Sequence, residues 1–541
     1  MRVCVSSSVL VLGLASTSLA GVSVQKSGLN VPEQYASRRD QVKDMFKSSY
    51  GAYMKYAFPH DDLAPSSTGF WDFTHQWGAS VIDAMPTMYI MGLTDLFNDA
   101  VKFAASVDFT QSKTGDTVNV FDTTIRFLGP LLASYELSNF KHPVLLAKAK
   151  QSADKLVHAW VGDTPIPYSF LNFTTNQPTN GTSNIAEAGT LLLEWSRLSK
   201  YTLNPKYVNL ATKAMKHIAN LPAPLPGLAA QVIDPATGNF VGGYVSWGSE
   251  SDSYFEYLIK YARLSNTWDN IYIDTWKTAV DSSIRSLLKK STVGNHTYLA
   301  DLDDEGRVLH IGSHLACFHA GNWIYGGKLV QNQTIVNYGL ELMEGCWNTY
   351  ASTTAGIGPE RFAYASPDGN FTGEGDPAPT AEQLAFYEQH GFYETIGFYV
   401  LRPEVLESNF YAWRATGDTK YLDRAGAAID AFNRYLLVPS GGYAGLNDVM
   451  DPGAGYWDIA DSFWYAETLK YLYLTFDDPK HISLDNYVFN TECSPFKAPP
   501  ALPSYKGSGG WLPWKPWKVW PTHGEVPAAT VSGVPRAGRK W

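Results

Sequence analysis

The chain has 541 residues and a net charge of −10 at pH 7, and 45% of its residues are hydrophobic. This length allows two to four domains or one large toroid or barrel, with ample apolar residues for a packed core. The negative charge argues against nucleic acids and anionic membranes as partners, because both require clustered Lys and Arg.

The first twenty residues have the pattern of a secretory signal. Arg2 precedes an apolar run, and the small residues just before position 21 fit a cleavage site. The run is too short for a membrane anchor, and no later run is apolar enough to span a bilayer. We therefore expect a signal peptide over 1–20, an N-terminal segment over 21–34, and a protein that is secreted or lies in the lumen of the secretory pathway.

The central part of the chain repeats a helix–turn–helix phrase. Residues 191–207 and 405–421 each contain an apolar helix with a Glu, then an Arg, a polar turn and Lys-Tyr at the start of the next helix. Looser versions lie at 254–272, 131–149 and 88–104. Repeated helical hairpins build either an open solenoid or a closed α/α toroid. Acidic residues at equivalent inner-helix positions favour the toroid.

Stretches rich in Gly, Pro and Asn separate these helices. They predict long loops or short hairpins at 162–182, 222–248, 351–382 and 438–456. The helical region is expected to end near Pro495. The tail over 497–541 is rich in Pro and Trp and has no periodicity, which predicts an extended or disordered chain.

The cysteines are informative because the protein is expected to be secreted. Cys4 leaves with the signal peptide, so Cys317, Cys346 and Cys493 remain. Three cysteines predict one disulfide and one free thiol, and the moderate loop between Cys317 and Cys346 favours that pair. Five Asn-x-Ser/Thr sequons agree with passage through the secretory pathway, at Asn172, Asn180, Asn295, Asn332 and Asn370.

Eight acidic residues lie among apolar or aromatic neighbours: Asp122, Glu187, Asp252, Glu256, Glu404, Glu407, Glu467 and Glu492. A buried carboxylate is costly unless it is paired, coordinated or functional, and any single one is most often a helix-end or ion-pair residue. As a set, in a chain without a nucleophile elbow or a phosphate loop, they indicate a carboxylate-lined cavity. Such a cavity suits glycoside hydrolysis or a hard cation such as Ca²⁺. No Cys or His pair has zinc-ligand spacing.

Ordered phrases from about residue 35 to 496 carry a resemblance. They include YAFPHDDLAP (56–65), VNVFDTTIRF (118–127), YVLRPEVLESNFYAWRATGDTKY (399–421) and LDNYVFNTECSPF (484–496). These phrases resemble glycoside hydrolase family 47, the class I α-1,2-mannosidases, and most of all its secreted fungal branch. The resemblance implies an all-α fold, an (α/α)7 barrel over 35–496 with small β-hairpins, one of which closes an end. It also implies a bound Ca²⁺ and removal of α-1,2-linked mannose from high-mannose N-glycans with inversion.

The resemblance also implies a role for each matching position. Glu404 would activate water as the general base, Asp252 would be a second essential acid, and Thr491 would give its hydroxyl and carbonyl oxygens to Ca²⁺. Phe463 would lie under the sugar, and the Cys317–Cys346 pair matches the family's disulfide. Orientation of carboxylates is expected from Arg126, His314 and Arg402, and contacts with sugar hydroxyls and calcium-bound waters from Glu187, Glu360, Glu407, Glu467 and Glu492.

Several positions depart from the family's pattern. The family's general acid is a Glu, and this chain has Asp122 there, which retracts the carboxyl by roughly one C–C bond; a misplacement of about 1 Å can cost on the order of a hundredfold in rate. Glu250 stands at a position linked to branch choice, where Arg or a small or apolar residue is more usual. Asp62, Pro86 and residues 73–76 differ as well. These departures predict altered glycan preference or a reduced rate, and a bridging water is a route by which Asp122 would still deliver a proton.

Three hypotheses follow from these residues. The first is a calcium-dependent, monomeric exo-α-mannosidase that acts on mannose-containing oligosaccharides or glycoproteins. The second is a catalytically weak protein on the same fold that binds mannose glycans or recognises glycoproteins. The third is a hydrolase of the same fold with another substrate, such as a fungal wall mannan. The first is favoured because a carboxyl persists at the acid position.

Overall fold

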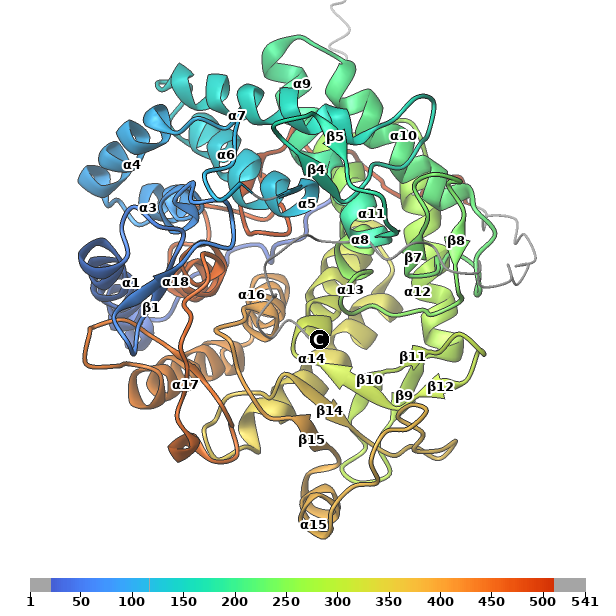
Figure 1. Ribbon diagram of the computed structural model, residues 1–541. Helices are drawn as coiled ribbons and strands as arrows, with labels where there is room; N and C mark the ends of the chain where they lie inside the picture. The colour runs from blue at the N-terminus through green and yellow to red at the C-terminus, as the bar shows by residue number, and fades with distance from the viewer. Residues whose placement is uncertain (1–20, 116, 510–541) are drawn as a thin grey trace, which may run out of the picture.

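The computed structural model describes residues 21–115 and 117–509. The expected signal peptide, Cys4 and residues 510–541 of the tail therefore lie outside the described residues. Within them, helices alternate between an inner and an outer position around a ring, which Figure 1 shows end-on. Short strands connect the helices, mainly on the side of the ring that faces the viewer.

Seven inner helices close the ring within the described part of the chain. Each contacts the next one along the chain, and the π-helical turn before the last inner helix contacts the first. The inner helices are α3 (Met85–Ile90), α6 (Gly129–Leu137), α9 (Leu192–Thr202), α11 (Asp252–Ser265), α13 (Phe318–Leu329), α16 (Glu404–Thr416) and α18 (Leu469–Phe476).

Seven outer helices surround them in the same described ranges. They are α1 (Ala36–Tyr56), α4 (Thr94–Ser106), α7 (Pro143–Leu156), α10 (Lys206–Asn220), α12 (Ile271–Ser286), α14 (Gln333–Ala351) and α17 (Lys420–Tyr435). The (α/α)7 barrel is thereby confirmed. Each of the five repeated sequence phrases spans an inner helix and the start of the following outer helix, as predicted.

Side-chain patterning explains which helices are inner and which are outer. In the inner helix α11 every residue from Ser253 to Leu264 is buried. The outer helix α10 instead buries a stripe at helical spacing, from Tyr207 through Ala211 and Ala214 to Ile218. A helix that is covered on all sides lies between other helices, whereas an apolar stripe covers one face only. Burial therefore assigns α11 to the inner layer and α10 to the outer layer.

Shorter helical pieces precede or follow the main helices. The α-helical ones are α2 (Ala79–Ile82), α5 (Val120–Thr123), α8 (Ile185–Gly189) and α15 (Ala381–His390). Two π-helical turns, η2 (Thr124–Leu128) and η6 (Trp464–Thr468), lead into α6 and α18. The 3₁₀ turns are η1 (Glu33–Tyr35), η3 (Val157–Ala159), η4 (Leu315–Cys317) and η5 (Pro452–Ala454).

The strands form small antiparallel sheets, and the predicted loops contain such hairpins. The two-stranded sheets are β1 (Asp62–Ala64) with β2 (Gly69–Trp71), β9 (Leu288–Lys290) with β10 (Thr297–Leu299), β11 (Asp301–Leu302) with β12 (Val308–Leu309), β16 (Gly445–Leu446) with β17 (Tyr456–Trp457), and β18 (Tyr487–Phe489) with β19 (Pro495–Lys497). The three-stranded sheets are β3 (Val118–Asn119), β4 (Phe170–Asn172) and β5 (Gln177–Pro178); β6 (Ser183–Asn184), β7 (Val232–Ile233) and β8 (Phe240–Val241); and β13 (Ile311–Ser313), β14 (Arg361–Ala363) and β15 (Tyr393–Ile396).

The hairpin β18–β19 enters the ring, and its turn meets three inner helices. Asn490 Nδ2 donates a hydrogen bond to Glu194 of α9 at 2.8 Å, and the Thr491 backbone N–H donates to the Tyr257 hydroxyl of α11 at 3.3 Å. Lys470 of α18 donates to the Cys493 carbonyl at 2.6 Å. The turn is thus held near the N-terminal ends of the inner helices.

The two ends of the described chain lie against one another and against the barrel. The Val22 backbone N–H donates to the Leu502 carbonyl at 2.9 Å. Residues 498–509 contain no helix or strand, yet Tyr505 is buried and Ser508 donates to Asp274 of α12. Among the described residues no helix is both long enough and apolar enough to cross a membrane.

Candidate active site

The predicted site residues lie where the inner helices begin. Asp252 and Glu404 are the first residues of α11 and α16, Asp122 lies in α5, Glu187 lies in α8, and Phe463 directly precedes η6. Because each inner helix is followed by an antiparallel outer helix, all inner helices point the same way, and their N-terminal ends meet at one end of the ring. A helix N-terminus favours negative charge, so this end suits a set of carboxylates.

Glu404 is held by a histidine and an arginine. His314 Nδ1 donates to Glu404 Oε2 at 2.9 Å, and Arg402 Nη1 lies 3.8 Å from Glu404 Oε1. Burial alone would raise the pKa of Glu404, but the His314 hydrogen bond and the charges of Arg402 and His314 outweigh it, so the pKa lies below its ordinary value. The carboxylate is therefore ionised at neutral and mildly acidic pH. An ionised, fixed carboxylate is suited to accept a proton from water.

A second ion pair fixes the arginine that faces Glu404. Arg402 Nε and Nη2 donate to the two carboxylate oxygens of Glu360 at 2.7 and 2.8 Å, in a buried bidentate pair. The fork geometry of a bidentate pair sets the orientation of the guanidinium as well as its position. Glu360 is thus a partner of Arg402, and it acts on Glu404 through that arginine.

Asp252 has the opposite electrostatic setting to Glu404. Its Oδ1 accepts hydrogen bonds from the Ser253 backbone N–H at 2.6 Å and from the Ser253 hydroxyl at 3.1 Å. Burial, with smaller contributions from the charges of Glu256 and Glu404, nevertheless raises the pKa of Asp252 to about 7. The two carboxyls thus differ in protonation over a wide pH range, which is the arrangement that acid and base roles require.

Asp122 and Arg126 form the i,i+4 pair expected from the sequence, but it is the weaker of two contacts. Arg126 Nε lies 3.7 Å from Asp122 Oδ1, whereas Arg126 Nη1 lies 2.5 Å from Glu492 Oε1. The Asp122 side chain is 31% exposed, and that of Glu492 is 3% exposed. Arg126 thus forms its shorter ion pair with Glu492. Its guanidinium also lies over the Phe463 ring, at 5.5 Å from the centroid. Asp122 is therefore the more open carboxyl.

Glu187 lies beside Asp122 on the neighbouring helix start. Asn119 caps α5 by accepting from the Asp122 backbone N–H, and its Nδ2 donates to Glu187 Oε1 at 3.2 Å. Burial raises the pKa of Glu187, and the charges of Asp122 and Glu250 add to that rise. Glu250 is exposed, and its carbonyl accepts from the Ala186 backbone N–H at 3.0 Å. Glu250 thus lies at the edge of this set of acidic residues and not among them.

Unusual backbone conformations concentrate around these residues. Glu250, Leu401 and Cys493 all have positive φ, at 68°, 66° and 55°. Glu250 lies two residues before Asp252, and Leu401 lies three residues before Glu404. Cys493 lies two residues after Thr491. Left-handed conformations at non-glycine residues, and π-helical turns such as η2 and η6, both occur often at functional sites. The local backbone therefore marks the same end of the ring as the side chains do.

The turn of the β18–β19 hairpin supplies the oxygen atoms expected for a cation. The Thr491 hydroxyl and the Glu467 carboxylate make no hydrogen bond or ion pair within residues 21–115 and 117–509. Burial raises the pKa of Glu467 well above its usual value, and the nearby charges of Glu492, Glu404 and Glu407 raise it further. Burial likewise raises the pKa of Glu407 to about 8.

This donor set fits a hard divalent cation, because carboxylates that repel one another are stabilised by positive charge and calcium prefers oxygen ligands. The described residues contain no group of three or more His, Cys, Asp or Glu placed to hold a metal directly. The fit is therefore to a cation held by the hydroxyl and carbonyl of Thr491, with carboxylates reaching it through water.

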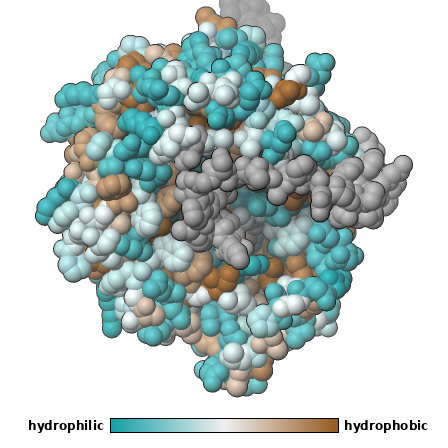
Figure 2. Space-filling view, viewed as in Figure 1, coloured by the Kyte–Doolittle hydropathy of each residue, from teal (hydrophilic) through white to brown (hydrophobic). Residues whose placement is uncertain are grey.

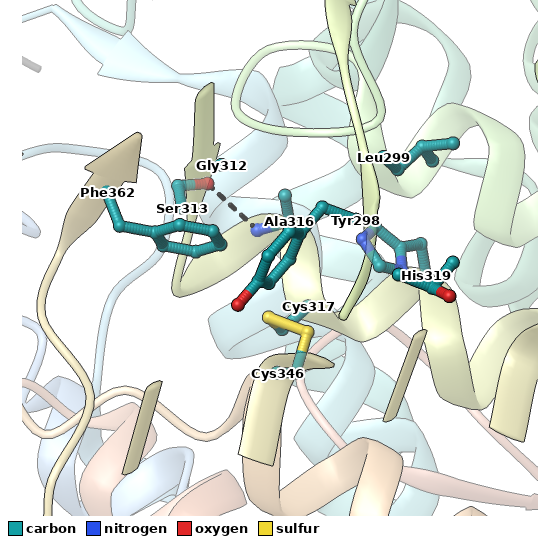
Figure 3. A pocket seen from close by; sticks show the side chains of 10 residues that line it. Tyr298, Leu299, Gly312, Ser313, Ala316, Cys317, His319, Cys346 and Phe362 are labelled. Atoms are coloured by element: carbon teal, nitrogen blue, oxygen red, sulfur yellow. Dashed lines mark hydrogen bonds between the residues drawn. A yellow bond between two sulfur atoms is a disulfide. The ribbon is translucent and has the colours of Figure 1, made fainter. Parts of the chain in front are cut away.

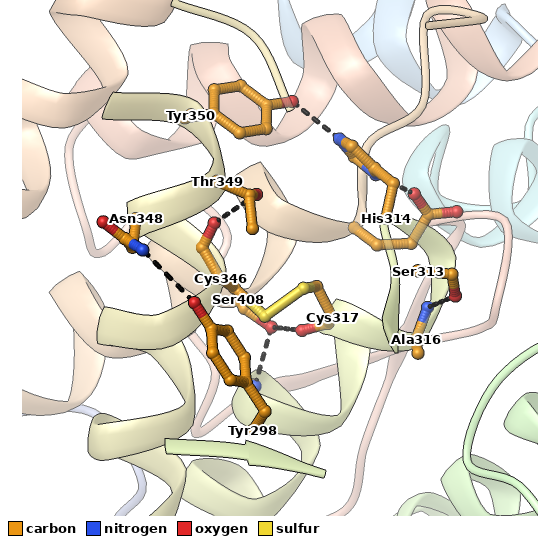
Figure 4. Close-up of a disulfide and its surroundings, with 12 residues drawn as sticks. Tyr298, Ser313, His314, Ala316, Cys317, Cys346, Asn348, Thr349, Tyr350 and Ser408 are labelled. Atoms are coloured by element: carbon orange, nitrogen blue, oxygen red, sulfur yellow. Dashed lines mark hydrogen bonds and ion pairs between the residues drawn. A yellow bond between two sulfur atoms is a disulfide. The ribbon is translucent and has the colours of Figure 1, made fainter. Parts of the chain in front are cut away.

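The predicted disulfide is present, and it joins η4, which directly follows His314, to α14. Cys317 in η4 is bonded to Cys346 in α14, and Cys493 is a buried free thiol. Figure 4 shows a second link between the same two elements, from His314 Nε2 to the Tyr350 hydroxyl at 2.7 Å. The disulfide thus helps to fix the histidine that holds Glu404.

A small cavity beside this disulfide is separate from the carboxylates. Figure 3 shows it between β10, β13 and the start of α13, with His319 at its wall. Burial lowers the pKa of His319 to about 3, so this imidazole is neutral. No carboxylate lines the cavity, so the candidate acid–base groups lie elsewhere.

Figure 2, in the same view as Figure 1, shows small groups of hydrophobic residues among hydrophilic ones on the face where the inner helices begin.

Sequence reasoning missed several supporting residues. Tyr350 bonds to His314, Ser462 bonds to Asp83 at 2.6 Å beside Arg126, and Tyr257 and Glu194 hold the hairpin turn. These contacts join residues that are far apart in the chain, so no local sequence pattern predicts them. The exception is Asn119, which lies three residues before Asp122 as Asn184 lies three before Glu187, a spacing typical of helix N-caps.

Comparison with known proteins gives one consistent result. The profile described as glycosyl hydrolase family 47 matches residues 45–498. The chain is 37% identical to a probable mannosyl-oligosaccharide alpha-1,2-mannosidase 1B of Aspergillus clavatus, over 90% of this chain and 98% of that protein. It is 38% identical to a mannosyl-oligosaccharide alpha-1,2-mannosidase 1B of Emericella nidulans, over 85% and 93%. The solved alpha-1,2-mannosidase from Trichoderma reesei matches with a TM-score of 0.82 and 34% identity, over 86% of this chain and 99% of that one.

Proposed function

The chain belongs to glycosyl hydrolase family 47 and is a glycoside hydrolase, and on this premise we propose that it removes terminal α-1,2-linked mannose from mannosyl-oligosaccharides with inversion at the anomeric carbon. The relatives named above are alpha-1,2-mannosidases, which supports the linkage. The site geometry supports the acid–base chemistry that such a reaction needs.

The main support for the proposal is the lowered pKa of Glu404 and its contacts with His314 and Arg402. This low pKa and these fixed contacts suit a general base. In the reaction, water would give a proton to Glu404 while its oxygen bonds to the anomeric carbon. The bond from that carbon to the glycosidic oxygen breaks, and the leaving oxygen takes up a proton. The products are free mannose and the shortened oligosaccharide.

Asp122 is the residue that we assign to proton donation. It stands at the position where the family's pattern has a Glu, and its side chain is more open than that of Glu404, at 31% against 13% exposure. The shorter side chain leaves space for a water molecule, which would pass the proton to the leaving oxygen. Asp252, whose pKa lies near 7, remains the second essential acid of the site.

We also propose that Thr491 holds Ca²⁺ through its hydroxyl and carbonyl oxygens, with Glu407, Glu467 and Glu492 contacting calcium-bound waters. When bound, the ion would fix sugar hydroxyls and offset the repulsion among these carboxylates. The test measures stability and not only activity: Ca²⁺ is expected to raise the melting temperature of the full chain, and Thr491→Val is expected to abolish that rise. An equal rise in the variant would contradict this site.

The activity test uses the intact protein with Ca²⁺ and linkage-defined mannobioses. We expect release of mannose from the α-1,2 isomer, with the β-anomer detected first by NMR, because inversion converts an α-linkage into a β-product. Binding of mannose oligosaccharides without release, together with restored release in Asp122→Glu, would instead identify a binding protein on this fold. Faster release from another isomer would identify a different substrate.

We further propose that the protein passes through the secretory pathway and is N-glycosylated. The disulfide supports this, as do the sequons, because Asn180, Asn295, Asn332 and Asn370 are all exposed. Asn332 caps α14 with its oxygen, while its amide nitrogen, the atom that bonds to a glycan, makes no hydrogen bond within the described residues. Expression in a eukaryotic host should give a mass that decreases on enzymatic deglycosylation.

A further inference from the structure

Two pairs of aromatic rings lie outside the acid–base group. Trp71 and Phe73 stack with centroids 5.3 Å apart and planes 10° apart, and Phe398 and Trp457 stack at 4.9 Å and 25°. Trp71 and Phe73 are 37% and 43% exposed, and the second pair is partly exposed. We call these four side chains the aromatic rim. Grouped, exposed aromatic faces commonly mark a binding surface.

Trp71 and the segment that follows Trp457 are tied to each other. Trp71 Nε1 donates to the Asp458 carbonyl at 3.0 Å, and the Asp458 carboxylate accepts from the backbone N–H groups of Ser66 and Ser67 at 2.6 and 3.1 Å. A β-bridge between Leu63 and Ala460 fixes the same two segments to each other. Rings that are already ordered lose little entropy when a ligand binds, so such a surface is suited to binding.

The rim adjoins the carboxylate site at two points. The Phe398 carbonyl accepts from the Glu360 backbone N–H at 2.9 Å, and Glu360 clamps the arginine beside Glu404. At the other pair, Trp71 faces Asp62 across the β1–β2 ribbon, and paired residues share a face. The charge of Arg126 acts on the Asp62 carboxyl. The rim therefore extends outward from the end of the ring that holds Asp122 and Glu404.

The chemistry of the rim suits a sugar chain. One face of a pyranose ring presents mainly C–H groups, which pack on a flat aromatic face, while its hydroxyls remain in water. An enzyme that removes one terminal mannose must leave the rest of the oligosaccharide outside the cleavage site. We propose that the aromatic rim stacks against mannose units of the substrate that lie beyond the two sugars joined by the cleaved bond. This inference rests on the proposed function.

The test compares a short and a long substrate. We expect Trp71→Ala and Trp457→Ala to raise the KM for a high-mannose N-glycan oligosaccharide about three- to tenfold each, the effect of losing one aromatic contact. The kcat/KM for α-1,2-mannobiose should change less than about twofold, because the disaccharide ends before the rim. Trp268→Ala is the matched control: Trp268 is 92% exposed but follows the C-terminal end of α11, away from the site.

Two further measurements keep the inference open to failure. Trp71→Phe retains an aromatic face but loses the bond to Asp458, so its KM should rise less than that of Trp71→Ala. Titration of the full-length Glu404→Gln protein with the oligosaccharide should show weaker binding when Trp71→Ala is added. Equal effects on both substrates, no effect on either, or a changed oligomeric state in Trp71→Ala would overturn the inference.

Failure of the inference and failure of the proposed function are distinguishable. If Trp71→Ala cleaves both substrates as the wild type does, the rim does not bind the substrate, yet the function stands. If the wild type releases no mannose from either substrate, the proposed function fails. In that case, titration of Glu404→Gln with and without Trp71→Ala still tests whether the rim binds the oligosaccharide.

Discussion

The two sides of the carboxylate site are built differently. Glu404 is 13% exposed and is held by His314, Arg402 and, behind them, Tyr350, Glu360 and the disulfide. Asp122 is 31% exposed, and its nearest cation lies 3.7 Å away and is committed to Glu492. The difference shows that Glu404, the proposed base, is held tightly, whereas Asp122, the proposed acid, has a shorter side chain and a more open carboxyl.

Removing the proposed base, Glu404, should have the largest effect. Glu404→Gln keeps the size of the side chain but cannot accept the proton of water, so kcat should fall by about a thousandfold or more. The melting temperature should change little, because Gln still accepts a hydrogen bond from His314. Mannose release from α-1,2-mannobiose is the measurement, and the exposed Glu382→Gln in α15 is the control. Retained activity in Glu404→Gln would show that another residue is the base.

Restoring the longer carboxyl tests the acid side. If Asp122 works through a bridging water, Asp122→Glu should raise kcat about ten- to a hundredfold, because the carboxyl then reaches the leaving oxygen directly. Asp122→Asn has the same size and no acidic proton, and it should lower kcat. A Glu variant that is no faster would mean that the site has adapted to the shorter side chain.

Removing a contact of Glu404 should leave this carboxylate less tightly held, as Asp122 is. His314→Leu removes the hydrogen-bond donor that lowers the pKa of Glu404, so that pKa should rise. A general base must be ionised, so kcat/KM should fall about tenfold at mildly acidic pH and recover as the pH rises. The pH profile is the readout. His319→Phe, which alters another buried histidine nearby that contacts no carboxylate, should leave the profile unchanged.

The last expected effect is on stability and not on rate, at Asp252. The folded-state pKa, about 7, lies above the ordinary value of 3.8, so the unfolded chain ionises first as the pH rises. Below pH 4 the group contributes nothing, and between pH 4 and 7 the folded state loses stability. By linkage, a rise of about three pKa units corresponds to about 4 kcal/mol, so Asp252→Asn should be more stable than the wild type by up to about 4 kcal/mol at pH 8 and equal to it near pH 3.5. Denaturation at both pH values measures this, and equal stability at pH 8 would contradict the raised pKa.

Much of the fold could be predicted from local patterns. The helix–turn–helix phrases spanned real inner and outer helices because each unit carries its own apolar periodicity and turn chemistry. The Cys317–Cys346 pair was also found correctly. Helix-capping asparagines at 119 and 184 follow a local rule as well, and that rule would have linked Asp122 and Glu187 to helix starts.

The partners of the site residues could not be predicted in this way. Arg126 was expected to orient a carboxylate, and Asp122 stands one helical turn away from it, but Glu492 from the distant hairpin takes its shortest contact. Tyr350 and Ser462 gave no signal, because each is an ordinary helix or loop residue until the ring closes. Hydrogen bonds between residues hundreds of positions apart depend on packing and not on spacing.

The sequence by itself determined the repeating helical unit, the kind of chemistry that its carboxylates favour, and the disulfide, because these depend on residue type and short-range order. Only the tertiary structure decided which carboxyl has a lowered pKa and which has a raised one. That choice depends on burial and on charges brought from separate elements: His314 and Arg402 lower the pKa of Glu404, while burial raises that of Asp252. Both acids stand at the start of an inner helix, and their surroundings alone set them apart.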